Sequence, residues 1–293
     1  MHPLLRSCHV LTYDGIPYHY ARASGDRDGE EGRRTQVEGR TFVSVRAADN
    51  RILANTDPPG LSERLTGRTV VSVGRRGKAL LLYDDLGGHT VIRFGMTGQL
   101  YVCPPDTAEE RHTHEVFLLD DGMELRYVDP RRFGHIWHFR RDEEDTSGIR
   151  GLGLEPDDPG LDAGYLKDRL GSRGITVKEG LLDQTVVAGI GNIWSDEMLF
   201  KAGICPLTPC RDLTDGQFED LAHVIPDIIS FAIGKNAVSR EEYLEGRGRR
   251  YYDVGYLRAY GHEGDPCPRC GKTFVKDTAG GRGTCWCPGC QRR

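Results

Sequence analysis

Four cysteines near the C-terminus have the spacing of a metal site. They form two C-x2-C pairs with sixteen residues between the pairs, and they are Cys267, Cys270, Cys287 and Cys290. A C-x2-C pair on a tight turn can place both thiolates on one ion, and a second pair completes a tetrahedral site. The spacing therefore predicts one structural Zn²⁺ per chain, with no open coordination position and hence no chemistry of its own. A reduced, metal-free cluster would leave the spacing unexplained, and the neighbouring Cys285 is expected to point away as a small strand residue.

A second group of residues could contact nucleic acid. The segment 129–134 (DPRRFG) places Arg131 and Arg132 beside Phe133. Arginine suits bidentate contacts to phosphates or bases, and a phenylalanine on a loop can wedge into a base stack. The alternative is a surface arginine pair flanking a core phenylalanine. Met96 lies near two glycines in 95–98 (GMTG), so it could equally be the tip of a turn or a core residue.

Two further motifs could bind anions. The segment 189–192 (GIGN) is a glycine turn before a predicted helix. The free N–H groups at the start of that helix favour an anion such as phosphate, and Asn192 can add a side-chain donor. It is not a dinucleotide fingerprint, because Trp194 stands where the third glycine belongs. A plain corner between two helices is the alternative. Lys78, with two arginines before it, forms a basic cluster that could simply be a solvated face.

The composition is that of an ordinary globular protein. The chain has 293 residues, 38% of them hydrophobic and 28% charged, and this length suggests about two domains. The sequence has no run of about 18 apolar residues and no signal-peptide core. Nine cysteines, an odd number without a secretory signal, argue against a disulfide framework. We therefore expect a cytoplasmic protein with no membrane partner.

The net charge of −5 conceals a polarity along the chain. Residues 246–293 carry a net charge of +6, and the rest of the chain carries −11. A basic tail on an acidic body can be a solvated surface, or it can be the electrostatic footprint of a phosphate-rich partner. Charge alone does not decide between them.

Hydrophobic periodicity predicts an α+β protein with a β-rich part and a helical part. Short apolar or alternating runs between residues 39 and 139 predict an antiparallel sandwich or barrel, and Asp121-Gly122 predicts a hairpin turn. The predicted strands are 69–73, 78–83, 89–102, 116–119 and 123–128. A charged linker at 140–148 precedes the predicted helices 161–170, 178–188, 193–202 and, interrupted by Pro226, 217–233.

The order of these motifs resembles the formamidopyrimidine-DNA glycosylase / endonuclease VIII family, and the DPRRFG motif favours its formamidopyrimidine branch. The matching segments run from about Val37 to Gln291. They are 74–78, 95–98, 112–114, 129–134, 152–156, 178–200 and the terminal cysteine element. The resemblance implies a β-sandwich at 37–140, a helix–two-turn–helix domain at 150–250 and a zinc-finger β-hairpin at 251–293. Residues 1–36 fit none of these and are expected to be flexible.

The resemblance implies a base-excision-repair DNA glycosylase and AP lyase that acts on oxidised purines in damaged double-stranded DNA, as a monomer associated with the nucleoid if bacterial. Lys78, His112 or His114, Asn192 and Arg282 match residues that grip phosphates. Met96, Arg131 and Phe133 match residues that fill the gap left by a flipped-out nucleotide. The full set of expected DNA contacts is Lys78, Met96, His112, His114, Arg131, Arg132, Phe133, Lys178, Asn192 and Arg282.

The N-terminus departs from the family pattern. In the family, the secondary amine of an N-terminal proline attacks C1′ of the sugar, a following glutamate transfers protons, and β,δ-elimination cuts the strand. This sequence starts Met1-His2-Pro3-Leu4-Leu5, so Pro3 does not follow Met1 and no carboxylate follows Pro3. The catalytic residues are therefore not identified by the sequence.

Three explanations stay open. The given start can differ from the native one, which would begin with Pro-Glu. The protein can instead be a relative that binds lesions or abasic sites without catalysis. Or a lysine such as Lys78 or Lys178 can supply a substitute amine, which would need its pKa lowered by desolvation or neighbouring cations. The preferred lesion is not predicted, because the expected lesion-contacting loop at 239–251 is divergent.

Overall fold

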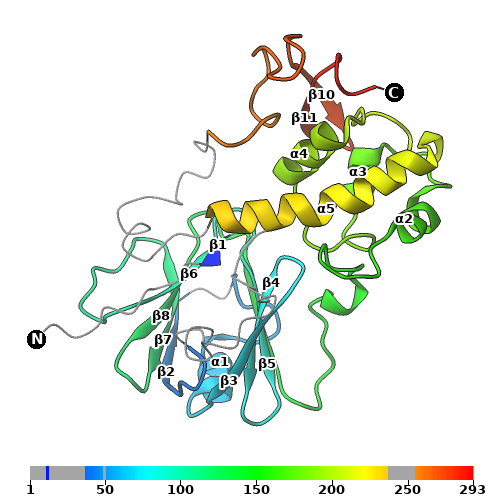
Figure 1. Cartoon of the computed structure of the whole chain (residues 1–293). Coiled ribbons are helices and arrows are strands. Elements are labelled where there is room, and N and C mark those ends of the chain that lie inside the picture. Colours follow the sequence, from blue (N-terminus) through cyan, green and yellow to red (C-terminus); the bar gives the residue numbers. More distant parts are fainter. Residues whose placement is uncertain (1–10, 13–36, 49–50, 237–254, 293) are drawn as a thin grey trace, which may run out of the picture. The chain divides into compact units, whose positions relative to one another are not determined.

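The computed structural model describes residues 11–12, 37–48, 51–236 and 255–292, which form two compact units (Figure 1). The first unit contains the described residues up to Arg150, and the second contains those from Gly151 to Lys235 and from Gly255 onward. Most of the segment 1–36 and the predicted lesion-contacting loop 239–251 lie outside the described residues. No helix in the described part of the chain is long and apolar enough to cross a membrane.

Two antiparallel sheets form the first unit, with the strand orders β1-β6-β8-β7-β2 and β3-β4-β5-β9. Apolar side chains from both sheets and from helix α1 (Pro58–Leu65) share one buried cluster, which includes Phe42, Leu61, Leu80 and Phe117. The predicted antiparallel β-sandwich is confirmed. Its strands are β1 (Leu11–Thr12), β2 (Phe42–Ala47), β3 (Val70–Arg76), β4 (Ala79–Asp84), β5 (His89–Arg93), β6 (Gln99–Cys103), β7 (Thr113–Leu119), β8 (Glu124–Val128) and β9 (His135–Phe139).

Two details of the predicted strands have different outcomes. The hairpin at Asp121-Gly122 is confirmed, since β7 pairs with β8 and Gly122 has a φ of 81°. The prediction of a single strand over 89–102 is wrong, because this segment forms two strands, β5 and β6, that lie in different sheets. Between them Gly95 has a φ of 61°, a left-handed conformation that favours glycine. Residues 94–98 therefore carry the chain from one sheet to the other.

The described residues of the second unit form four α-helices, a short 3-10 helix (Cys210–Asp212) and a two-stranded hairpin. Helix α5 runs through Pro226 as one element, where the sequence predicted an interruption. Helix α3 stops at Leu182 rather than continuing to residue 188. The reason is Asp183, whose carboxylate accepts hydrogen bonds from the N–H and hydroxyl of Thr185 and so turns the chain. The elements are α2 (Ala163–Leu170), α3 (Val177–Leu182), α4 (Asn192–Ala202), α5 (Asp215–Asn236), β10 (Val275–Ala279) and β11 (Arg282–Trp286).

Helix α4 forms the centre of the second unit. Every residue from 193 to 200 is buried, so this helix is surrounded on all sides. In Figure 1 the hairpin β10–β11 lies beside α4, and Phe200 of α4 shares a buried cluster with Phe274, Cys285 and Cys287 of the C-terminal segment. The hairpin therefore packs on the helix. The predicted boundary between a helix–two-turn–helix domain that ends at residue 250 and a zinc-finger domain that begins at residue 251 stays a prediction.

Candidate DNA interface and zinc site

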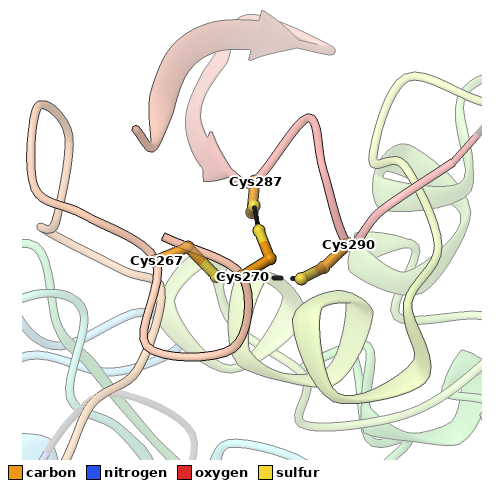
Figure 2. A group of neighbouring side chains, drawn as sticks. All are labelled: Cys267, Cys270, Cys287 and Cys290. Carbon is orange, nitrogen blue, oxygen red and sulfur yellow. Dashed lines mark hydrogen bonds between the residues drawn. The ribbon is translucent and has the colours of Figure 1, made fainter. Parts of the chain in front are cut away.

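The four predicted cysteine ligands converge on one point. Their sulfur atoms all lie within 4.8 Å of one another, and Figure 2 shows the side chains pointing toward a common centre. The Sγ atoms of Cys267 and Cys290 are 3.8 Å apart, and those of Cys270 and Cys287 are 3.4 Å apart. A tetrahedral Zn²⁺ with Zn–S bonds of about 2.3 Å needs sulfur–sulfur distances of about 3.8 Å. The residues fit a closed structural zinc site, as the sequence predicts.

Backbone N–H groups donate to two of the ligand sulfurs. The N–H of Arg269 donates to Cys267 Sγ, and the N–H of Gly289 donates to Cys287 Sγ, each at 3.4 Å. Burial raises the pKa of Cys267, but the donated hydrogen bonds lower it more, to about 7. Cys285 does not belong to the cluster and instead packs in the apolar core of this segment, where burial raises its thiol pKa to about 12. Cys285 is thus a structural strand residue.

The strand register gathers the candidate residues of the first unit at one end of the sandwich. In one sheet Ala79 pairs with Arg93, which pairs with His135, so Lys78, the turn after β5 and Phe133 lie at the same end. In the other sheet Val128 pairs with both Gln99 and Thr113, which places His112 and Asp129 at that end too. Residues that are far apart in the sequence therefore form one surface, which we call the sandwich end.

Two apolar side chains project from the sandwich end. Phe133 is 50% exposed and Met96 is 45% exposed. Their turns are packed together, since a Cβ on Gly95 would lie 2.4 Å from the carbonyl carbon of Phe133. The guanidinium of Arg131 lies 4.7 Å from the centre of the Phe133 ring, at cation–π distance. Phe133 is therefore not a core residue, and Met96 lies at the tip of a turn.

The carboxylate of Asp129 fixes these turns. Asp129 is fully buried, and its oxygens accept hydrogen bonds from the Thr97 hydroxyl, the Arg131 N–H at 3.2 Å and the Gly134 N–H at 2.8 Å. The Met96 turn and the Phe133 turn are thus bound to one carboxylate. Asp129 belongs to the 129–134 motif, but the sequence pattern predicts no role for it.

The remaining candidates of the first unit differ in exposure. His114 is buried, and its Nε2 lies 2.9 Å from the carbonyl oxygen of Asp129, so it supports the turn from within. His112 and Lys78 are partly exposed. Arg132 has a φ of 54°, which is costly for a residue other than glycine, and its N–H donates to the Asp129 carbonyl at 3.3 Å. Of the two histidines, His112 is the more accessible.

The candidates of the second unit meet at the carbonyl oxygen of Gly283. Lys178 Nζ donates to this oxygen at 2.8 Å, and Asn192 Nδ2 donates to it at 3.2 Å. Arg282 is the preceding residue and is exposed. Lys178 itself is buried and lies 2.7 Å from the Asp196 carboxylate. Burial lowers the pKa of Lys178 and raises that of Asp196, while their mutual attraction opposes both shifts.

Sequence reasoning missed two acidic residues of α4. Asp196 is the partner of Lys178, and Glu197 accepts backbone N–H groups from Arg258, Ala259 and Tyr260 at 2.8–3.1 Å. Burial raises the pKa of Glu197, and these donated hydrogen bonds oppose the shift. An Asp-Glu pair inside an otherwise apolar helix was the available signal, because charged residues are rarely buried without partners.

Three family models match successive parts of the chain. They are the "Formamidopyrimidine-DNA glycosylase N-terminal domain" over residues 30–136, the "Formamidopyrimidine-DNA glycosylase H2TH domain" over 152–242, and the "Zinc finger found in FPG and IleRS" over 264–293. The sandwich and the helical part thus each match a domain of one class of DNA glycosylases, and the zinc segment matches a zinc finger that this class shares with IleRS.

Curated relatives and solved structures agree. The formamidopyrimidine-DNA glycosylase of Stenotrophomonas maltophilia (strain R551-3) is 39% identical over 236 residues, which cover 80% of this chain and 86% of the relative. That of Pelotomaculum thermopropionicum is 34% identical over 258 residues, 88% of this chain and 94% of the relative. The Lactococcus lactis glycosylase bound to DNA with an abasic site has a TM-score of 0.77 at 28% identity, and the match covers 88% of this chain and 94% of that one. The chain belongs to the formamidopyrimidine-DNA glycosylase family.

Proposed function

We propose that this protein is a base-excision-repair DNA glycosylase and AP lyase that removes oxidised purines from double-stranded DNA. Its relatives carry the name formamidopyrimidine-DNA glycosylase. Similar solved structures contain DNA with an abasic site, with a formamidopyrimidine-dG lesion or with a carbocyclic 8-oxo-G. These ligands belong to those proteins and motivate the proposal for this one.

The observation that carries the proposal is the pair of exposed apolar tips at the sandwich end. An enzyme cannot reach the sugar of a stacked nucleotide, so it must extrude the nucleotide, which costs a few kcal/mol. Apolar side chains that enter the vacated space offset part of that cost. Met96 and Phe133 are exposed on turns that a buried carboxylate fixes, with Arg131 beside the ring. This arrangement suits insertion into a base stack.

The proposed reaction needs a neutral amine. Its lone pair forms a bond to C1′ while the glycosidic bond breaks, and the base leaves with the electron pair of the glycosidic bond and takes up a proton. After the nitrogen has lost a proton, its lone pair breaks the C1′–O4′ bond, O4′ takes up a proton, and the opened sugar is left as an iminium. Lys178 is a poor candidate, because its ammonium is buried between Asp196 and the Gly283 carbonyl. Lys78 lies at the sandwich end, and the nitrogen of Pro3 is an amide in this sequence because His2 precedes it.

Borohydride trapping tests this function. The purified protein is incubated with duplexes that carry an 8-oxoguanine or an abasic site, with sodium borohydride to reduce the iminium. We expect a covalent protein–DNA complex, strand cleavage without borohydride, and a modified residue that mass spectrometry of the trapped peptide identifies. Binding to the abasic duplex without trapping or cleavage would support the non-catalytic relative. Equal affinity for damaged and undamaged duplexes would contradict both.

The finer expectations on assembly and location belong to the same proposal. We propose that one chain acts as a monomer, because a single chain carries both groups of candidate DNA contacts and the zinc site. We also propose a cytoplasmic location, associated with the nucleoid if the source is bacterial, since the substrate is DNA. Light scattering of the protein–DNA complex tests the stoichiometry, and more than one chain per duplex would contradict it.

A further inference from the structure

The carbonyl of Gly283 joins the partly buried Asn192 and the exposed Arg282 to a buried ion pair. It accepts one hydrogen bond from Asn192 at 3.2 Å and one from Lys178 at 2.8 Å. Gly283 directly follows Arg282 in β11. The position of this single carbonyl therefore affects Asn192 through a hydrogen bond and Arg282 through the peptide backbone.

The ion pair binds three successive residues of β11. Lys178 Nζ lies 2.7 Å from Asp196 Oδ1 and donates to the Gly283 oxygen. The Thr284 hydroxyl donates to Asp196 Oδ1 at 2.6 Å, and the Cys285 N–H donates to Asp196 Oδ2 at 3.1 Å. Both charged side chains are buried, with 0% and 1% of their surfaces exposed. The pair thus fixes β11 to helices α3 and α4 immediately after Arg282.

The other side of Arg282 is also fixed. The turn between β10 and β11 contains Gly280 and Gly281, with φ angles of 55° and 72°. A Cβ on Gly280 would lie 2.4 Å from Cγ of Glu179, so the turn packs tightly on α3. Glu179 is itself held by the capping box that it forms with Thr176. Arg282 is therefore an exposed side chain on a backbone that is fixed on both sides.

We propose that Lys178 and Asp196 are positioning residues, which orient Arg282 and Asn192 for DNA phosphates without themselves contacting DNA or attacking it. This inference rests on the proposed function. The ammonium is enclosed by protein and uses its donors on Asp196 and Gly283. A guanidinium and an amide that are already oriented lose less conformational entropy when they bind, so a fixed β11 increases affinity.

A double-mutant cycle separates positioning from direct contact. The charge-free variant Lys178→Met/Asp196→Asn removes the hydrogen bond from Lys178 to Gly283, while the single amide oxygen of the asparagine can still accept one of the two hydrogen bonds that β11 donates. It is made in the wild-type chain and in an Arg282→Ala/Asn192→Ala background. The dissociation constant for a duplex with a tetrahydrofuran abasic analogue is measured as a function of NaCl concentration.

Positioning predicts non-additive effects. In the wild-type chain, the charge-free variant should weaken binding about tenfold, the effect expected for a lost charged hydrogen bond. In the Arg282→Ala/Asn192→Ala background it should change neither the affinity nor the salt dependence. A direct Lys178–phosphate contact would instead lower the slope of log K against log salt by about 0.9 in both backgrounds. Additive effects, or no effect in the wild-type chain, would overturn the inference.

The chain offers a matched control and a milder variant. Lys167 and Asp215 form the same kind of pair at 2.7 Å on the exposed surface of this unit, so Lys167→Met/Asp215→Asn should leave binding unchanged. Zinc content and circular dichroism establish that each variant folds. If the charge-free variant does not fold, Thr284→Val replaces it in the double-mutant cycle, because this change removes one hydrogen bond to Asp196. Positioning again predicts weaker binding in the wild-type chain and no effect in the Arg282→Ala/Asn192→Ala background. A wild-type protein that does not prefer the abasic duplex would refute the proposed function, independently of the cycle.

Discussion

Each unit presents its candidate DNA contacts from a backbone that a buried carboxylate organises, but the two carboxylates have different partners. Asp129 in the sandwich accepts hydrogen bonds from neutral groups, the Thr97 hydroxyl and the N–H groups of Arg131 and Gly134. Asp196 in the helical unit accepts from a lysine ammonium as well as from neutral groups of β11. Asp129 thus holds the sandwich end through hydrogen bonds to neutral groups, whereas Asp196 adds an ion pair and the hairpin also carries the zinc-ligand cysteines.

The two regions use different supports because they differ in how much apolar surface they can bury. The turns of the sandwich end continue strands that share a large apolar core. The hairpin has two strands of five residues, and a two-stranded hairpin is at best marginally stable in water. Its exposed arginine therefore depends on supports from outside the hairpin, the zinc site and helix α4. We expect the hairpin to be the more easily disrupted of the two regions.

Removal of the metal should have the largest effect. Apparent zinc-binding energies in zinc-finger peptides are about 10–16 kcal/mol, which exceeds the stability of a small hairpin. Chelation, or Cys287→Ala, should unfold the hairpin and abolish binding to the abasic duplex, measured by fluorescence anisotropy, while the strands of the sandwich stay folded. Cys285→Ala is the control and should retain one zinc per chain. A metal-free protein with full affinity would show that the hairpin does not need zinc.

The ion pair should give the next largest effect. Asp196→Ala leaves a buried ammonium without its partner, and such changes cost about 3–5 kcal/mol. Urea unfolding should therefore show a large loss of stability. The exposed counterpart Asp215→Ala, whose side chain is 76% exposed, should not shift the midpoint measurably. Equal shifts for the two variants would mean that the buried pair contributes no more than a surface pair.

Short-range sequence patterns predicted much of this molecule. The zinc ligands follow from spacing within 24 residues of chain, the β7–β8 hairpin from Asp121-Gly122, and α4 from the helical spacing of its residues. The exposed DNA candidates came from the resemblance to a family with fixed motifs. Local chemistry is sufficient in these cases because the residues that determine the structure are neighbours in sequence.

The organising residues could not be predicted in the same way. Asp196 acts through Thr284, which lies 88 residues further along the chain, and Asp129 acts through Thr97, 32 residues earlier. No local pattern links such positions. Lys178 could not be placed from local sequence either. Its basic side chain suggested DNA contact or catalysis, but it is buried, and its hydrogen-bond partner Gly283 lies 105 residues further along the chain.

Asp129→Ala should have a smaller effect than Asp196→Ala. No charged partner is left behind, but the buried N–H groups of Arg131 and Gly134 lose their acceptor, at a cost of about 1–3 kcal/mol. Because the Met96 and Phe133 turns would loosen, the ratio of affinities for abasic and undamaged duplexes should fall several-fold, with little change in salt dependence. Asp121→Ala on the exposed β7–β8 turn is the control. An unchanged ratio would contradict the role assigned to Asp129.

Acid should destabilise the sandwich through His138. Burial is the main cause that lowers the pKa of His138 to about 4; Asp84 opposes this shift, and Arg64 contributes to it. An unfolded histidine has a pKa of about 6.5. Between these values only the unfolded chain binds the proton, so stability should fall by about 1.4 kcal/mol per pH unit as the pH drops from 6.5 toward 4. Across this range the urea midpoint should change less with pH in His138→Gln than in the wild-type protein. An equal change with pH in both would contradict the role of His138 in acid destabilisation.

Two hairpin glycines give the smallest and most direct test of the comparison. Gly122 in the sandwich and Gly280 in the zinc hairpin both have positive φ, 81° and 55°, so alanine at either should cost about 1 kcal/mol in backbone strain. Only Gly280 has a close neighbour, Glu179, whereas a Cβ on Gly122 would meet nothing within 4 Å. Thermal melts should therefore show small losses for both variants, but only Gly280→Ala should also weaken binding to the abasic duplex, because it displaces the turn that precedes Arg282. Equal DNA affinities for the two variants would indicate that the hairpin tolerates movement at its tip.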